Sequence, residues 1–296
     1  MLEILIPTIS QGLLWSLLAI GVYLSFRVLD IADLSVEGTF PLGAAVAASV
    51  LSAGGGVILA MILALAAGCI AGVITALLTT KMKIPALLAG ILSMIGLYSV
   101  NLHIMGKANI SLLRVDTVFT WAENFLADYM WAAFAVGVIA TVIVGVGIYW
   151  FFGTELGTAI RATGNNSQMA RAQGINTDTM IILGLLFGNG LVALSGALVA
   201  QANGFADVGM GVGTIVIGLA SVIIGEVLFG TRSFLNSLIS VILGSIVYRL
   251  VIAVVLQMGM PPNDLKLFTA ILVAIALSMP LIKAKFVAGR ARTLKE

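Results

Sequence analysis

Charged residues are scarce in this chain: Asp, Glu, Lys and Arg make up 9% of its 296 residues, whereas hydrophobic residues make up 60%. An average soluble domain is about 25% charged. A soluble core could not hide this much apolar side chain, so lipid must be the solvent for most of the surface. The formal net charge of +2 is too small to indicate a nucleic-acid partner.

Residues and motifs that serve catalysis or metal binding are also nearly absent. The single cysteine, Cys69, lies inside an apolar run and cannot form a disulfide within the chain. The single histidine, His103, has no second candidate ligand and so makes no metal site. The sequence contains no Gly-x-x-x-x-Gly-Lys-Ser/Thr motif for ATP, and segment 190–196 is not a nucleophile elbow. We therefore expect no catalytic residues, no cofactor and no metal in this chain.

What the chain does contain is a series of long apolar runs. A helix that crosses the hydrocarbon of a bilayer needs roughly 20 such residues, and these runs lack the alternation of barrel strands. The sequence therefore predicts an all-α fold, a polytopic membrane helical bundle that forms one domain over residues 1–296. About nine spans are expected, with a range of eight to ten because the second and seventh are short and rich in glycine. They are residues 4–26, 34–52, 57–80, 85–105, 130–152, 179–200, 213–230, 234–257 and 265–282.

Basic residues are distributed unevenly between the two ends of these spans. Lys and Arg concentrate on the cytoplasmic side of membrane proteins, and five of them lie in segment 283–296. With that C-terminal tail in the cytoplasm and nine spans, eleven of the fifteen Lys and Arg fall on the cytoplasmic side. The N-terminus then lies outside, and the polar stretch 153–178 lies in the cytoplasm.

Two polar segments near the start of expected spans resemble each other. Asp33-Leu-Ser-Val-Glu-Gly-Thr39 and Asp207-Val-Gly-Met-Gly-Val-Gly-Thr214 would enter the membrane from opposite sides. Such a relationship is typical of the inverted repeats from which many transporters are built. Asp33 can cap a helix start, and Pro41 favours an interrupted segment close behind it. Two unrelated glycine-rich helix starts would explain the same residues, and both interpretations stay open here.

A few polar and aromatic side chains fall inside the expected spans and are candidates to line a path. Charged groups within a bilayer are costly and usually functional. Arg249 can extend outward to the membrane surface, pair with Asp207 or Asp264, or hold the carboxylate of a substrate; we favour the structural options. A direct pair with Glu226 is not expected, because the two lie roughly 15 Å apart in depth at 1.5 Å per residue. The candidate pathway residues are Ser35, Glu37, Thr39, Phe40, Ser93, Asn189, Thr214 and Arg249.

The polar stretch 153–178 is rich in small residues and helix formers. We expect one helix over residues 155–163 that ends at Gly164, and a second over residues 167–173 that begins after Asn165 or Asn166. Small side chains on these helices, among them Ala159, Ala162, Ala170 and Ala172, would let a partner protein approach closely. A solvated helical hairpin with no partner is an equally good interpretation of the chemistry alone.

The spacing of this stretch is similar to that of a known family. The pattern Gly157-x-Ala-Ile-Arg-Ala-x-Gly-x-Asn-x-x-x-Ala-x-x-x-Gly-Ile-Asn176 resembles the coupling loop in permease subunits of bacterial ABC importers of the branched-chain amino acid and ribose permease superfamily. The resemblance runs from the first span to Leu281 and is nearest to the tryptophan- and tyrosine-type subfamily. It implies that this loop docks into a groove of a cytoplasmic ATPase. The implied coupling residues are Glu155, Gly157, Ala159, Arg161, Ala162, Gly164, Asn166, Ala170, Arg171, Gly174 and Ile175.

The resemblance also implies a cellular setting. The chain would be a multi-pass permease subunit in the bacterial plasma (inner) membrane, importing a small solute such as an aromatic or branched-chain amino acid. ATP and Mg would be bound by the partner ATPase. A second copy of the permease would complete a homodimer, and an extracytoplasmic substrate-binding protein would dock on the outer loop 106–129.

Three alternatives compete with this interpretation. An ABC importer of a sugar or a nucleoside would look the same in sequence. An ion-coupled secondary transporter would need acidic residues deep in the bundle, for which Glu37 and Glu226 are the nearest candidates. A structural or scaffold membrane protein is the third alternative.

Overall fold

The computed structural model describes residues 2–126, 128–259, 264, 267–271, 273–275 and 278. The described chain is almost entirely helical, as the sequence predicts. Its elements, in order, are α1 (Leu2–Tyr23), the π-helical segment η1 (Leu24–Val28), α2 (Val36–Ser52), α3 (Val57–Thr80), α4 (Ala86–Met105), β1 (Asn109–Ser111), α5 (Val118–Leu126), α6 (Tyr129–Phe152), α7 (Glu155–Asn165), α8 (Ser167–Ala172), α9 (Thr177–Asn203), β2 (Phe205–Asp207), the 3-10 turn η2 (Val208–Gly211), α10 (Thr214–Phe229) and α11 (Phe234–Gln257).

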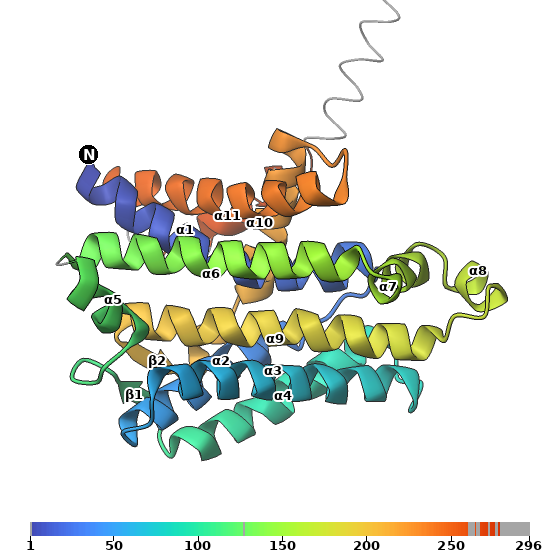
Figure 1. The fold of residues 1–296 in the computed structure, drawn as a ribbon, viewed down its shortest axis with the longest axis horizontal. Coiled ribbons are helices and arrows are strands. Elements are labelled where there is room, and N and C mark those ends of the chain that lie inside the picture. The colour runs from blue at the N-terminus through green and yellow to red at the C-terminus, as the bar shows by residue number, and fades with distance from the viewer. Residues whose placement is uncertain are drawn as a thin grey trace, which may run out of the picture.

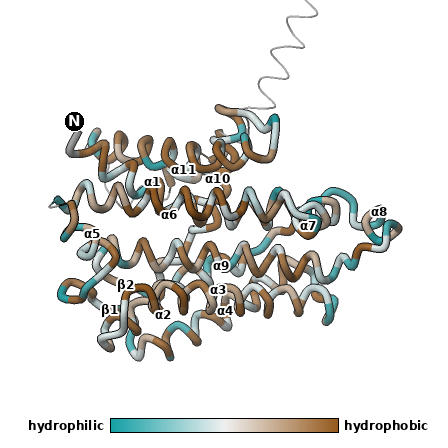
Figure 2. The backbone as a smooth tube through the Cα atoms, viewed as in Figure 1, coloured by the Kyte–Doolittle hydropathy of each residue, from teal (hydrophilic) through white to brown (hydrophobic). Residues whose placement is uncertain are grey.

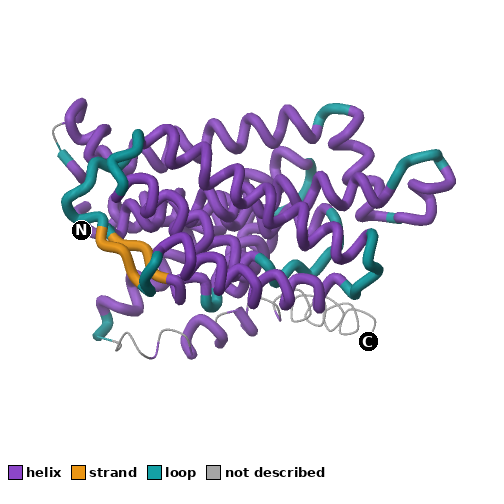
Figure 3. Tube along the Cα trace, turned by 90° about the horizontal axis from the view of Figure 1, so that it is seen from below, coloured by secondary structure: helices purple, strands orange, loops and turns teal. Residues whose placement is uncertain are grey.

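The long helices run side by side along one axis of the molecule (Figure 1). One end, called here the sheet end, carries α5 and the antiparallel pair β1 and β2, in which Ile110 lies opposite Ala206. The opposite end, called the hairpin end, carries α7 and α8, and α8 projects beyond the other helices. Figure 3 shows the same layout after a quarter turn. Hydrophilic residues gather at these two ends, and the length between them is largely hydrophobic (Figure 2).

Seven of the described helices are long and apolar enough to cross a membrane, which confirms the polytopic helical bundle. The expected count of about nine is not reproduced. Helix α2, at 17 residues, is shorter than a full span. The span expected at 265–282 is described only at residues 267–271, 273–275 and 278, and the basic tail lies outside the described residues. The seven are Ile4–Val28, Val57–Thr80, Ala86–Met105, Tyr129–Phe152, Thr177–Asn203, Val208–Phe229 and Phe234–Gln257.

Helix α9 lies at the centre of the bundle, where α2 crosses it in backbone contact. A Cβ added at Gly43 of α2 would lie 1.9 Å from the carbonyl oxygen of Ala193 in α9. A Cβ at Gly196 of α9 would lie 2.0 Å from the carbonyl oxygen of Phe40. Lipid tails are as apolar as leucine, so close packing of small residues is a main source of helix association in membranes. These glycines therefore set the distance between α2 and α9.

The expected interruption near Pro41 lies elsewhere in the structure. Pro41 is inside α2, and the non-helical segment is residues 29–35, immediately before the helix. Proline lacks the N–H that would bond to the carbonyl four residues earlier, which here belongs to Glu37. Gly211 of η2 packs against that carbonyl, with space for no side chain. Pro41 thus leaves a carbonyl open at the contact with η2 and does not end the helix.

The contact between α2 and α9 predicts a strong effect of one added methyl group. We expect Gly43→Ala to lower the unfolding free energy by about 1–3 kcal/mol, because overpacking against a backbone has no flexible side chain to yield. The measurement is thermal unfolding of the purified protein in detergent. Gly96→Ala in α4 is the matched control, since nothing lies within 4 Å of its added Cβ. Equal melting temperatures for the two variants would contradict this account of the packing.

Candidate functional site

A buried polar network holds the start of α2 against α9. The Asp33 carboxylate accepts hydrogen bonds from the Ser35 backbone N–H at 2.9 Å and from the Ser35 hydroxyl at 2.5 Å. Its other oxygen accepts from the Asn189 amide nitrogen at 2.8 Å. The Asn189 amide oxygen faces the hydroxyls of Thr39 at 2.7 Å and Ser35 at 3.1 Å. Three of the predicted pathway residues, Ser35, Thr39 and Asn189, therefore come together around Asp33.

This network lies near the middle of the bundle. Asn189 is roughly 18 Å from the Thr177 end of α9 and roughly 21 Å from the Asn203 end, at 1.5 Å per residue. Asp33 is 3% exposed and Asn189 is fully buried. Backbone and side-chain polar groups at this depth need partners within the protein. The network supplies them for its own side chains and for the Ser35 N–H, and the Leu34 and Ser35 carbonyls accept the N–H groups in the first turn of α2. Helix α2 can therefore begin inside the bundle rather than at its end.

A second helix start meets the first one. The Asp207 carboxylate accepts from the Gly209 N–H at 2.7 Å, and the Thr214 hydroxyl donates to the Gly211 carbonyl at 2.8 Å. The Gly213 N–H, at the residue before α10, donates to the Glu37 carboxylate at 3.0 Å. The first turn of α2 thus supports the start of α10, and Glu37 and Thr214 lie at this junction.

Arg249 takes none of the ion pairs considered for it within the described residues. Its guanidinium carbon lies 4.1 Å from the centre of the Trp15 ring, and Trp15 stacks at a tilt on Phe40 with ring centres 5.1 Å apart. Long side chains on a helix lean toward its N-terminus, which for α11 is the hairpin end. Arg249 therefore reaches into the bundle instead of extending outward. Glu226 pairs with Arg27 of η1 through both carboxylate oxygens.

Ser93 stands apart from these clusters. It accepts a hydrogen bond from Thr75 at 2.7 Å, which joins α4 to α3. The list of candidate pathway residues leaves out Asp33, which the sequence indicates only as a helix cap, and it leaves out Trp15. Asp33 could have been found from the Asp-x-Ser spacing, which lets a carboxylate accept the N–H two residues later. Trp15 carries no such local signal, because its contact with Arg249 depends on how α1 packs on α11.

The hairpin end is built from three capped helices. The side chains of Thr154, Asn166 and Asn176 accept from backbone N–H groups at the starts of α7, α8 and α9. The expectation that Gly164 ends the first helix is wrong, because α7 continues through it to Asn165. A Cβ at Gly164 would lie 1.8 Å from the carbonyl oxygen of Val28. This glycine therefore serves the contact between α7 and η1.

Exposure divides the implied coupling residues into two groups. Gly157 and Ala170 are buried. The expectation that Ala170 is exposed to a partner protein is therefore wrong. Glu155, Asn166, Arg171 and Gly174 are exposed, and the others are half-buried. The large exposed apolar side chains here are Leu156 and Met169, each 50% exposed, and the small Ala172 is exposed beside them. An outward surface of the hairpin therefore consists of these residues and their polar neighbours.

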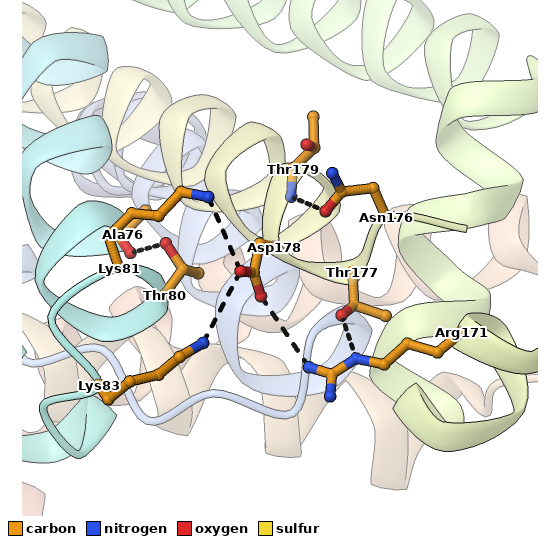
Figure 4. Close-up of polar contacts among 9 residues, drawn as sticks. All are labelled: Ala76, Thr80, Lys81, Lys83, Arg171, Asn176, Thr177, Asp178 and Thr179. Atoms are coloured by element: carbon orange, nitrogen blue, oxygen red, sulfur yellow. Dashed lines mark hydrogen bonds and ion pairs between the residues drawn. The ribbon is translucent and has the colours of Figure 1, made fainter. Parts of the chain in front are cut away.

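Charges tie the hairpin to the rest of its end of the bundle. Asp178, in the first turn of α9, lies 3.9 Å from Lys81, 3.7 Å from Lys83 and 3.9 Å from Arg171 (Figure 4). Arg171 of α8 also donates to the Thr177 hydroxyl at 2.7 Å. Single exposed ion pairs contribute about 0–1 kcal/mol. Their value here is positional, because one carboxylate joins α8, α9 and the turn between α3 and α4.

The site contains groups that bind and position, and few that react. Among the described residues, no group of three or more His, Cys, Asp or Glu could hold a metal ion. The polar groups form hydrogen bonds at the starts of α2 and α10. At the hairpin end, the basic side chains around Asp178 are exposed.

Comparison with known proteins gives a consistent group of relatives. Residues 4–277 match the family described as branched-chain amino acid transport system, permease component. The chain is 40% identical over 269 residues to the tyrosine transport system permease protein of Clostridioides difficile, covering 91% of this chain and 88% of that protein. It is 35% identical to an uncharacterized protein of Rickettsia prowazekii, covering 94% and 98%. It is 28% identical to the autoinducer 2 import system permease protein of Yersinia pseudotuberculosis, covering 85% and 70%. No solved structure matches the chain.

The network around Asp33 predicts a clear stability difference between two asparagines of α9. We expect Asn189→Ala to lower the unfolding free energy by about 1–3 kcal/mol or more, since it leaves buried polar groups without partners. Asn203→Ala is the control, because Asn203 is exposed and makes only a 3.4 Å bond to Gln11. Thermal unfolding in detergent measures both. If the two variants unfold alike, the network does not hold α2 in place.

Proposed function

Because the chain belongs to the family of permease components of branched-chain amino acid transport systems, we propose that it is the membrane subunit of an ATP-driven importer for an aromatic or branched-chain amino acid. The observation that carries this proposal is the 40% identity to a tyrosine transport system permease protein, over 91% of this chain. The match spans the central helices and the hairpin together, so it concerns the whole bundle. A sugar or nucleoside substrate is the main alternative within the same class of importer.

The proposed orientation puts the hairpin end in the cytoplasm. Basic residues gather there, with Arg27, Lys81, Lys83, Arg161 and Arg171 all at that end of the described bundle. Cytoplasmic loops carry an excess of Lys and Arg. In this proposal residues 29–52 form one crossing, part extended and part helical, and residues 265–282 form the ninth. The C-terminus is then cytoplasmic.

We also propose that the two interior helix starts are inverted repeats. Helix α2 runs from the middle of the bundle to the sheet end, where the Ser49 hydroxyl donates to the Ile104 carbonyl at 2.9 Å. Helix α10 runs from the middle to the hairpin end, where Glu226 pairs with Arg27. Asp33, ahead of α2, and Asp207, at the start of η2 ahead of α10, each accept the N–H two residues later. Broken helices in corresponding positions of two halves are the usual pointer to a transport path.

Coupling to ATP would begin at the hairpin. In this proposal α7 and α8 dock into a groove of a cytoplasmic ATPase, which binds ATP and Mg. A push on the hairpin passes to η1 through the contact of Gly164 with Val28, and to the start of α9 through Asp178. Helix α9 carries Asn189, which holds the start of α2. Two copies of the permease would form the path, and a substrate-binding protein would dock at the sheet end.

The docking surface is tested with a charge placed on its exposed apolar residue. We expect Met169→Glu to reduce co-purification with the ATPase, and ATP-dependent uptake, by about tenfold, equivalent to about 1.4 kcal/mol of binding. Leu113→Glu is the matched control for co-purification with the ATPase alone, because Leu113 is 83% exposed at the opposite end of the bundle, in the loop proposed to meet the binding protein. A Met169→Glu protein that folds, binds the ATPase and supports full uptake would show that the partner docks elsewhere.

The energy source separates the proposal from an ion-coupled transporter. Proteoliposomes that contain the permease, its ATPase and its binding protein should accumulate labelled L-tyrosine or a branched-chain amino acid only when ATP is supplied. Ionophores that collapse proton and sodium gradients should leave the initial rate unchanged. Uptake that follows an ion gradient with no ATPase present would overturn the importer assignment, and uptake of only a sugar or nucleoside would overturn the substrate class.

A further inference from the structure

A cavity of about 400 Å³ lies where α2, α4 and η2 meet. Its polar lining comes from Glu37 of α2 and from Tyr98, Ser99 and Asn101 of α4. Ligand pockets for small molecules begin at about 300 Å³. The cavity therefore has room for a small solute, and it lies beside the junction of the two interior helix starts.

Asn101 presents an acceptor with no partner. The residue is fully buried, and its amide nitrogen donates to the Gly38 carbonyl at 3.1 Å. Its amide oxygen has no hydrogen-bond partner. Turning the amide over would place that oxygen against the Gly38 carbonyl, so the assignment of the two atoms is clear. A buried acceptor without a partner is unfavourable, so Asn101 adds an uncompensated acceptor beside the cavity.

Glu37 brings a carboxylate to the same cavity. One of its oxygens accepts from the Gly213 N–H at 3.0 Å. The carboxylate makes no ion pair within the described part of the chain, and no Lys or Arg lines the cavity. Hydroxyl groups of Tyr98 and Ser99 add further acceptors, and the Tyr98 ring adds a face that attracts cations. The lining thus offers acceptors and negative charge, without a basic group to balance them.

We infer that this cavity is a binding site for a primary ammonium group, held by the Glu37 carboxylate. An ammonium has three donors and no acceptor, which complements this lining. The inference rests on the proposed function in one respect, since an amino acid in transit would present its α-ammonium here. Glu37 also accepts the Gly213 N–H just before α10. A bound ammonium would therefore share the Glu37 carboxylate with the contact between α2 and α10.

The test measures whether a thiol in the cavity reacts faster with a cationic than with an anionic reagent, and it needs neither ATP nor transport. In the purified full complex, with Cys69→Ser as background, Ser99→Cys places a thiol in the cavity wall. Its rates of modification by 2-aminoethyl and 2-sulfonatoethyl methanethiosulfonate are compared, each normalised to the rate with a free thiol. A cleft lined by one sign of charge raises the local concentration of the opposite charge by about tenfold or more. We expect a preference of that size for the cationic reagent.

Glu37→Gln should abolish that preference while keeping an oxygen that can accept the Gly213 N–H. Asp116→Asn is the matched charge control and should leave the preference intact, because Asp116 is exposed at the sheet end. Ser111→Cys is the positional control, because Ser111 is also exposed there, and its modification should not respond to Glu37→Gln. Equal normalised rates at Ser99→Cys, or a preference that survives Glu37→Gln, would overturn the site.

Protection separates the site from the substrate assignment. L-Tyrosine should slow modification of Ser99→Cys, and 3-(4-hydroxyphenyl)propionate, which lacks the amine, should not. If the cationic reagent is preferred but L-tyrosine and branched-chain amino acids give no protection, the ammonium site stands and the amino-acid assignment of the transporter falls. If amino acids are transported but the cationic reagent is not preferred, the transporter stands and the site falls.

Discussion

The need to satisfy polar groups in the interior of a bilayer governs this structure. A helix that begins at mid-depth exposes N–H groups where no water can reach them, and unsatisfied groups there cost several kcal/mol. In the first turn of α2 the N–H groups donate to the Leu34 and Ser35 carbonyls, and the Asp33 carboxylate accepts the Ser35 N–H just before them. The polar side chains at this depth, those of Asp33, Ser35, Thr39 and Asn189, satisfy one another through hydrogen bonds of 2.5–3.1 Å. The other features of the core depend on this network. It brings α2 against the glycines and alanines of α9, and it carries Glu37 to the start of α10.

Helix α9 connects the two ends of the molecule through polar side chains at three depths. Asp178 binds the basic residues of the hairpin end, and Asn189 binds the start of α2 in the middle. At the sheet end, Gln201 accepts a hydrogen bond from the Val118 N–H at the start of α5. A single rigid helix therefore contacts the surface proposed to meet the ATPase, the broken helices, and the surface proposed to meet the binding protein.

Hydropathy and capping chemistry predict most of the fold. The spans at 57–80 and 234–257 agree with α3 and α11, and the two short helices of the hairpin appear within two residues of their expected limits. Local patterns fail where a tertiary contact decides. Gly164 is a residue type that often ends a helix, but it lies within α7, where η1 packs against it. Pro41 is a residue type that often interrupts a helix, but it lies inside α2. The sequence favours an Arg249 that pairs with an acidic residue or extends to the membrane surface. In the structure its guanidinium lies over the ring of Trp15.

The network around Asp33 also has a consequence for biogenesis. Asp33 and Asn189 are 156 residues apart in the chain. Synthesis at about 5–20 residues per second separates their emergence from the ribosome by roughly 8–30 s. During that interval the start of α2 has none of its α9 partners, so it must be sheltered at the insertion machinery or in the polar headgroup layer. The contact between α2 and α9 can therefore form only after the C-terminal half of the chain has begun to emerge.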